Sequence, residues 1–196
     1  MIDIPRFGIS PVVAPVADSW HTIDAWLGRH APAGAARLRP PATPEVIGRA
    51  EERLGFALPA DLRESLLCHD GEEGRHFGSL PSGPLYSTER IVETRGTRMR
   101  HWDADDPDEA QTPWWGTLWV PFAGRDGDDH FIDAGPGLWR DHLGYAAHDD
   151  CAHFLGWPTL GAWLQAVAEA MLHHDDPDHA TQLHRPVLRR DGTVEW

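Results

Sequence analysis

The sequence predicts an α+β fold, in which a central, mostly antiparallel β-sheet is flanked by helices. Three observations lead to this prediction: apolar residues recur at helical spacing in the first half of the chain, two apolar segments flank a turn-rich stretch near the middle, and one more helical pattern follows. Helices that precede the strands as a block, rather than alternating with them, favour an antiparallel sheet. The 196 residues, 41% of them hydrophobic, are enough for one domain with short extensions.

The first predicted helix begins near residue 19. Residues 1–18 have no clear period and are interpreted as a loose N-terminal arm. Ser19 is a suitable N-cap, and Trp20, Ile23 and Leu27 then share one face of the helix. The segment that follows, up to about residue 42, is rich in Pro, Gly and Ala and predicts a loop.

Two helices with clear boundary signals come next. Thr43 is an expected N-cap with a proline directly after it, and Gly55 ends this second helix. A third helix opens at Pro59 and carries leucines at core spacing. It is predicted to stop near His69-Asp70-Gly71, where the glycine supplies a left-handed turn.

The middle of the chain combines a charged block with a predicted hairpin. A fourth helix is expected from Ser87. Residues 95–109, basic and then acidic, are interpreted as a solvated and partly self-neutralising loop. Strands at 118–122 and 130–133 flank the turn-rich residues 124–129, and this arrangement predicts a β-hairpin.

The last third of the chain predicts one more strand and one long helix. The short strand is expected at 138–141. The helix covers 160–172, where the apolar residues recur at core spacing. The tail, 173–196, could form a small hairpin about Asp191-Gly192.

Two groups of residues carry a recognisable pattern. The first is Glu51, Leu54, Gly55, Leu58, Pro59, Asp61 and Leu62, followed by Cys68, His69, Asp70 and Gly71. The second is Trp119, Val120, Pro121, Phe122 and Ala123, followed by the acidic turn and strand of 126–133, which ends in Asp133. In order and spacing, these groups resemble the two signatures of the SMI1/KNR4 family, part of the SUKH superfamily. The structural signature residues are Gly55, Leu58, Pro59, Asp61, Asp70, Gly71, Trp119, Pro121, Phe122 and Asp133.

The resemblance implies an arrangement of domains and a range of functions. It covers residues 19–172, which leaves the arm 1–18 and the tail 173–196 outside, and the block at 103–109 looks like an insertion. Proteins of this family have an α+β domain without a known shared catalytic centre. Bacterial members act as immunity proteins that bind toxins, many of them nucleases, and fungal members act as interaction proteins in cell-wall signalling.

Charge and composition restrict the partners. The formal net charge of −14 disfavours nucleic acid and anionic membrane surfaces and favours basic protein partners. The sequence contains neither a signal peptide nor an apolar stretch long enough to span a membrane. Two cysteines are ordinary in a reducing compartment, so a cytoplasmic location is expected.

The sequence contains no recognised template for catalysis or cofactor binding, so the chain is predicted not to be an enzyme and to need no cofactor. The acidic turn fails the EF-hand pattern, because Phe131 stands where glycine is required. Two histidine clusters, 148–153 and 173–179, lack the paired spacing of zinc sites. They are interpreted as incidental surface histidines, with zinc binding as the alternative.

The expected binding surface is the hairpin turn and the neighbouring Trp loop. Carboxylates there would pair with Arg or Lys of the partner, and the two tryptophans would provide apolar contacts. The alternative is that the tryptophans pack the loop onto the sheet. The predicted partner-binding residues are Asp103, Asp105, Asp106, Trp114, Trp115, Asp126, Asp128 and Asp129.

The leading functional prediction is a bacterial immunity-type protein that binds and neutralises a basic toxin domain, for example a nuclease. The family resemblance and the acidic charge support it. The alternative is a regulatory or scaffold interaction module related to regulators of cell-wall assembly or signalling. An enzyme of unrecognised type is a third alternative, and no catalytic template supports it.

Overall fold

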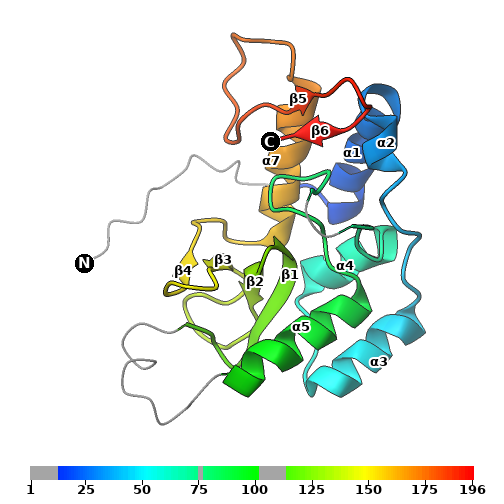
Figure 1. The fold of residues 1–196 in the computed structure, drawn as a ribbon. Coiled ribbons are helices and arrows are strands. Elements are labelled where there is room, and N and C mark those ends of the chain that lie inside the picture. The colour runs from blue at the N-terminus through cyan, green and yellow to red at the C-terminus, as the bar shows by residue number, and fades with distance from the viewer. Residues whose placement is uncertain (1–12, 75–76, 102–113) are drawn as a thin grey trace.

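The computed structural model describes residues 13–74, 77–101 and 114–196, and within them it has the predicted α+β fold (Figure 1). Four strands form an antiparallel sheet in the order β1-β2-β3-β4, and a separate pair, β5-β6, lies near the C-terminus. The helices are α1 (Val16–His30), α2 (Pro32–Ala35), α3 (Pro44–Leu54), α4 (Ala60–Cys68), α5 (Thr88–His101) and α7 (Leu160–Leu172). The strands are β1 (Trp119–Arg125), β2 (Asp128–Asp133), β3 (Leu143–Ala146), β4 (His153–Phe154), β5 (Val187–Leu188) and β6 (Val194–Glu195).

Helix α1 packs along α7, with Trp20, Ile23 and Leu27 buried (Figure 1). The indole Nε1 of Trp20 donates to Ser65 Oγ of α4 at 2.9 Å, which ties a third helix to this pair. The predicted start of α1 at Ser19 is wrong, because the carbonyl of Pro15 already accepts the first backbone hydrogen bond and Ser19 is buried inside the helix.

Helices α3 and α4 begin where the boundary signals predict. Thr43 Oγ1 accepts from the Val46 amide at the start of α3, and Gly55 takes the left-handed conformation after its end, at φ +84°. Helix α4 follows Pro59. It ends at Cys68, at the predicted stop near His69-Asp70-Gly71. Gly71 has a positive φ of +77°, but the residue that follows the helix directly is His69, whose backbone is extended. The loop predicted before α3 contains the short helix α2.

The signature residues Asp61, Asp70 and Gly71 connect elements that are distant in the sequence. Asp70 Oδ1 accepts from the Thr88 amide at 2.7 Å, so this carboxylate caps the start of α5. Asp61 Oδ2 accepts from the Gly161 amide at 2.8 Å, at the start of α7. A Cβ on Gly71 would lie 2.4 Å from the Ser87 backbone nitrogen, so only glycine allows this close approach. Each acid therefore caps a helix that begins far from it in the sequence.

The β1–β2 hairpin is tighter than predicted. Its strands extend to Arg125 and Asp128, which pair directly, so that only Asp126-Gly127 remain as the turn. Both turn residues have positive φ, +54° and +96°, as a two-residue type I′ turn requires. The register shifts at a bulge between Pro121 and Ala123 on β1, the edge strand.

The predicted strand at 138–141 is wrong. These residues form a turn in which Asp141 has φ +65°, and Leu138 is 78% exposed. The third strand is Leu143–Ala146. Of the remaining signature residues, Leu58, Trp119, Pro121 and Phe122 are buried, and Asp133 at the end of β2 accepts from the Gly135 amide.

The C-terminal tail forms the expected hairpin and folds back onto α2 (Figure 1). The Gly192 carbonyl accepts from the amides of Ala33 and Gly34 at 3.0 and 3.3 Å. Trp196 Nε1 donates to the Ser79 carbonyl at 3.0 Å. None of the helices in the described ranges is long and apolar enough to cross a membrane.

Candidate partner-binding site

The candidate site is an open groove of about 390 Å³ between α5 and the turn of the β1–β2 hairpin. Arg90, Thr94, Thr97 and His101 line it from α5, and Trp114, Asp126 and Gly127 line it from the opposite side. The fold thus brings three of the predicted site residues, Trp114, Asp126 and Asp129, to one groove.

The floor of the groove is a buried ion pair between α5 and β2. Arg98 Nε donates to Asp129 Oδ2 at 2.7 Å, and the two side chains are only 7% and 5% exposed. The second oxygen of Asp129 accepts from the Tyr86 hydroxyl. Arg98 Nη2 also donates to the carbonyls of Gly127 and Ala146, so one guanidinium joins α5 to the hairpin turn and to β3.

This geometry corrects two predictions. Asp129 was expected as a surface carboxylate, but its bonds to Arg98 and Tyr86 leave it unavailable to a partner. Arg98 was placed in a solvated loop, whereas it lies on the buried side of α5. A signal for its burial exists in the sequence, since Arg98 follows the buried Ile91 by seven residues, which is two helical turns.

Burial controls protonation in this cluster. It raises the pKa of Asp129 above its ordinary value, while Tyr86 and Arg98 act in the opposite direction. Burial, together with the neighbouring Asp129 carboxylate, raises the pKa of Tyr86 strongly. The Tyr86 hydroxyl therefore keeps its proton and acts as the hydrogen-bond donor to Asp129.

The two tryptophans of the predicted binding surface separate in the structure. Trp115 is fully buried against Trp119 and Phe131, so its prediction as an exposed contact residue is wrong. It holds the loop on the sheet, as the alternative interpretation expected. Trp114 is half-buried, and the Arg98 guanidinium lies 4.6 Å from its ring centre, within cation–π range.

The remaining predicted carboxylates have different surroundings. Asp126 is exposed at the hairpin turn. Asp128 accepts from the Tyr145 hydroxyl and from both the amide and the ring Nδ1 of His148. Partial burial acts to raise the pKa of Asp128, but these hydrogen bonds outweigh it and lower the pKa to about 2. Asp103, Asp105 and Asp106 lie outside the described residues.

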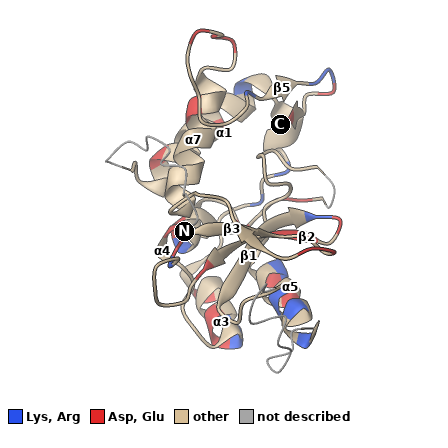
Figure 2. Ribbon diagram, turned by 90° about the vertical axis from the view of Figure 1, so that its left-hand side faces the viewer, with Lys and Arg blue, Asp and Glu red and all other residues tan. Residues whose placement is uncertain are grey.

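Helix α5 presents further residues that the sequence interpretation missed. A second groove, of about 590 Å³, lies along its other side and shares Arg90, Thr94 and Thr97 with the first. Figure 2 shows charges of both signs on α5, so this surface is mixed rather than acidic. Continuing the helical pattern past residue 95 would have revealed this helix face.

Comparisons with known proteins place this geometry in a wider context. The family model of the SMI1 / KNR4 family (SUKH-1) matches residues 41–166. A KNR4/SMI1 homolog of Yarrowia lipolytica is 39% identical over 85 residues, which is 42% of this chain and 12% of that protein. The glucan synthesis regulatory protein of Neurospora crassa is 38% identical over 78 residues, or 40% of this chain and 14% of that protein.

A third relative is the cell wall assembly regulator SMI1 of Saccharomyces cerevisiae, 35% identical over 68 residues, which is 35% of this chain and 14% of that protein. The chain therefore spans only about an eighth of the length of the curated relatives it matches.

These relatives contradict the prediction of a bacterial immunity protein with a basic toxin partner. All three are fungal, and two are named as regulators of glucan synthesis or cell wall assembly. The prediction was wrong because the signature residues occupy caps, turns and core positions. Residues with such structural roles cannot distinguish immunity proteins from regulators that share the fold.

Proposed function

Because the chain belongs to the SMI1/KNR4 (SUKH-1) family, we propose that it is a non-catalytic regulatory module that binds a protein partner in cell wall assembly. The observation that carries this proposal is the similarity of part of this chain to fungal regulators of glucan synthesis and cell wall assembly. Fold alone does not determine function, so the proposal is tied to a particular surface.

The proposed partner surface is the exposed face of α5 together with the Asp126-Gly127 turn. Two grooves flank this face, and the buried Arg98–Asp129 pair and the Asp70 cap hold α5 in place. A surface that is already ordered loses little conformational freedom on binding. Half-buried Trp114 adds apolar area to a groove that Arg90, Arg125 and Asp126 also line, which suits a protein surface of mixed charge.

The predicted acids remain part of this proposal in a reduced form. Asp126 is retained on the basis of its exposure. Asp103, Asp105 and Asp106 are retained because they lie between α5 and Trp114 in the sequence. Asp129 is removed from the set, since Arg98 and Tyr86 engage it.

We propose residues 16–172 as the functional domain. The boundary expected at residue 19 moves to Val16, where α1 begins, and the end stays at Leu172, the last residue of α7. We also propose a cytoplasmic location, because Cys68 and Cys151 are free thiols and suit a reducing compartment. Imaging a fluorescent fusion in the native cell tests the location.

Site-specific cross-linking in the native cell tests the surface. A photoreactive residue at Thr97 would attach to the partner, whereas the same residue at Arg190, exposed in the C-terminal tail, is the matched control. We expect one protein to be captured from Thr97, to be absent from the control, and to be lost when Arg90→Glu is added. Equal capture from both positions would show that α5 is not the partner surface.

A second measurement tests the regulatory role. Cells without this chain are compared in wall glucan content with cells that carry the wild-type chain, the Arg90→Glu variant or an Arg190→Glu control. We expect wild type and control to restore the wall and Arg90→Glu to fail. A wall that does not change when the chain is removed contradicts a role in cell wall assembly.

A further inference from the structure

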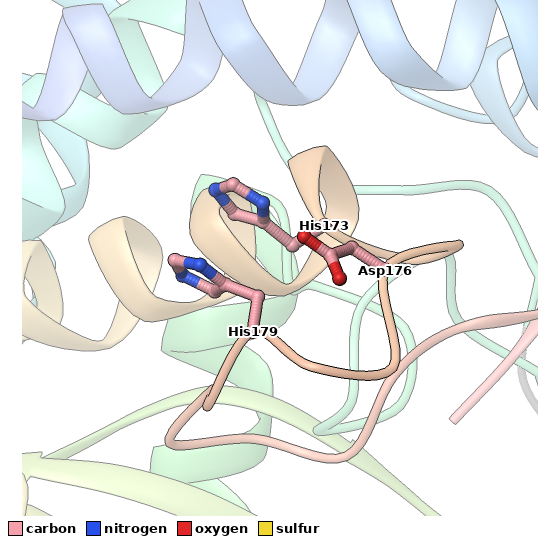
Figure 3. Close-up of side chains that lie close together, drawn as sticks. All are labelled: His173, Asp176 and His179. Carbon is pink, nitrogen blue, oxygen red and sulfur yellow. The ribbon is translucent and has the colours of Figure 1, made fainter.

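Three potential metal ligands come together just after α7, where the chain reads His173-His174-Asp175-Asp176-Pro177-Asp178-His179. The Asp176 amide donates to the His173 carbonyl at 3.2 Å, and the His179 amide donates to the Asp176 carbonyl at 3.4 Å. Two successive turns of this kind place every third residue on one side. His173, Asp176 and His179 consequently share a side, as Figure 3 shows.

The ligand atoms of these three side chains all lie within 4.8 Å of one another. The imidazole rings of His173 and His179 are stacked, with their centroids 3.5 Å apart and their planes 9° from parallel. Both histidines are half-buried and Asp176 is exposed, so an ion has access from solvent. One ion can bind all three ligands once each imidazole ring rotates so that one of its nitrogens points at the ion.

Other residues hold this arrangement in place. Arg185 Nε donates to the His173 carbonyl at 3.1 Å and its Nη2 donates to the His179 carbonyl at 2.6 Å, so one side chain fixes both ends of the turn. His179 Nε2 lies 3.3 Å from Glu169 Oε1 on α7. A carboxylate on one ring nitrogen leaves the other nitrogen free as a ligand, which is the usual support of a metal-bound histidine.

The other histidines of the sequence clusters behave differently. His174 turns away from this group, and its Nδ1 accepts from Trp26 Nε1 at 3.2 Å. His148 bonds to Asp128 through its ring Nδ1. Within the described ranges, His173, Asp176 and His179 are the one group of three potential ligands that meets at this distance. Residues that look incidental in the sequence are thus brought together by the local backbone turns.

We propose that His173, Asp176 and His179 bind a divalent transition-metal cation of the Zn²⁺ type. Two imidazole nitrogens and one carboxylate oxygen are ligands that Zn²⁺ accepts, and a water molecule completes a tetrahedral site. The site lies outside the matched family region, 41–166, and is independent of the proposed partner surface. Binding would fasten the C-terminal tail to the end of α7.

Calorimetric titration of the metal-free full-length chain with Zn²⁺ tests this assignment. We expect one saturable site per chain. His179→Gln and Asp176→Asn should each weaken the affinity for Zn²⁺ by about tenfold or more, because losing even a residue that only supports a metal ligand has an effect of that size. Circular dichroism confirms that the variants remain folded.

Two controls separate this site from other metal-binding groups. His184→Gln removes an exposed histidine of the same tail, and the double variant His148→Gln/Cys151→Ser removes the other cluster. Both are expected to keep wild-type affinity. The proposal is overturned if the wild-type chain shows no saturable site, if His179→Gln binds as tightly as wild type, or if the double control loses the site.

Discussion

The Arg98 side chain shows how one residue can hold three elements together. Its guanidinium bonds to Asp129 on β2, to the Gly127 carbonyl in the turn and to the Ala146 carbonyl on β3. A buried charge that loses its partner stays desolvated and uncompensated, so breaking such a pair is far more costly than breaking an exposed one. The Arg53–Glu89 pair, with side chains 50% and 62% exposed, provides the comparison within this chain.

Replacing Arg98 is therefore expected to destabilise the protein strongly. Arg98→Met leaves Asp129 buried without its counterion, and we expect the free energy of unfolding to fall by about 3–5 kcal/mol. Arg53→Met, the matched control, should lower it by less than about 1 kcal/mol. Urea denaturation followed by tryptophan fluorescence measures both changes. Equal effects of the two substitutions would mean that the buried pair contributes no more than a surface pair.

His130 makes stability depend on pH. Burial lowers the pKa of His130 to about 4, and its Nδ1 has no hydrogen-bond partner among the described residues. The unfolded chain, with an ordinary histidine pKa near 6.5, binds the extra proton between these two values. The contribution of His130 is thus fully present above about pH 6.5 and is lost as the pH falls towards 4, by on the order of 3 kcal/mol.

Urea denaturation at several pH values checks this expectation. His130→Leu should make the decline in the free energy of unfolding between pH 6.5 and 4 smaller than in wild type. His21→Leu, at an exposed position on α1, is the control and should keep the wild-type decline. If both variants keep it, another group causes the pH dependence.

At the scale of single residues, the sequence shows the chemical character of each side chain but does not show which side chains the fold buries. Asp126 is exposed as expected, whereas Asp129, three positions later, is buried. The difference arises because Arg98 and Tyr86, 31 and 43 residues earlier, supply the partners of Asp129. Trp115 likewise becomes core because Trp119 and Phe131 surround it. Such contacts depend on the tertiary fold and leave no local pattern in the sequence.

The helices illustrate which boundaries local chemistry determines. The limits of α3 were predicted from Thr43 and Gly55, and those of α7 agree with the apolar period at 160–172. Helix α5 runs further than predicted, because its last turns are stabilised by Arg98 and its bonds to the sheet. The strand β4 has only two residues and pairs with β3, so sequence alternation cannot indicate it.

The cap at the start of α5 gives a test at the level of elements. Asp70→Ala removes the oxygen that accepts from the Thr88 amide, and we expect the free energy of unfolding to fall by about 1 kcal/mol, in the usual range for a helix cap. Glu52→Ala, at an exposed position on α3, should have almost no effect. Urea denaturation compares them. A change as small as that of the control would contradict a capping role.

The molecule as a whole extends beyond its matched family region. The matched region, residues 41–166, does not include α1 and ends inside α7. Yet Trp20, Ile23 and Leu27 of α1 are buried in the core. We expect a shortened chain of residues 41–166 to lose cooperative unfolding, and a chain of residues 13–182 to keep it. Urea denaturation distinguishes the two. Cooperative unfolding of the shorter chain would show that α1 is dispensable.

The order of the helices and strands in the sequence was enough to predict the fold class, but it was not enough to predict the function. Helices in a block before an antiparallel hairpin predict an α+β fold whatever the chain binds. The signature residues that point to the family cap helices, form turns or fill the core, so they carry no information about the partner. The names of the relatives, rather than the signature residues, favour a regulator over an immunity protein.

The hydrogen bond from the Gly161 amide to Asp61 has a kinetic consequence. Its two residues lie 100 positions apart, so the bond closes a very long loop, and we expect it to form after the local contacts of α3 and α4. Interactions absent from the folding transition state affect the unfolding rate alone. We expect Asp61→Ala to speed unfolding in stopped-flow measurements and to leave the folding rate nearly unchanged. This acid would thus determine the lifetime of the native state.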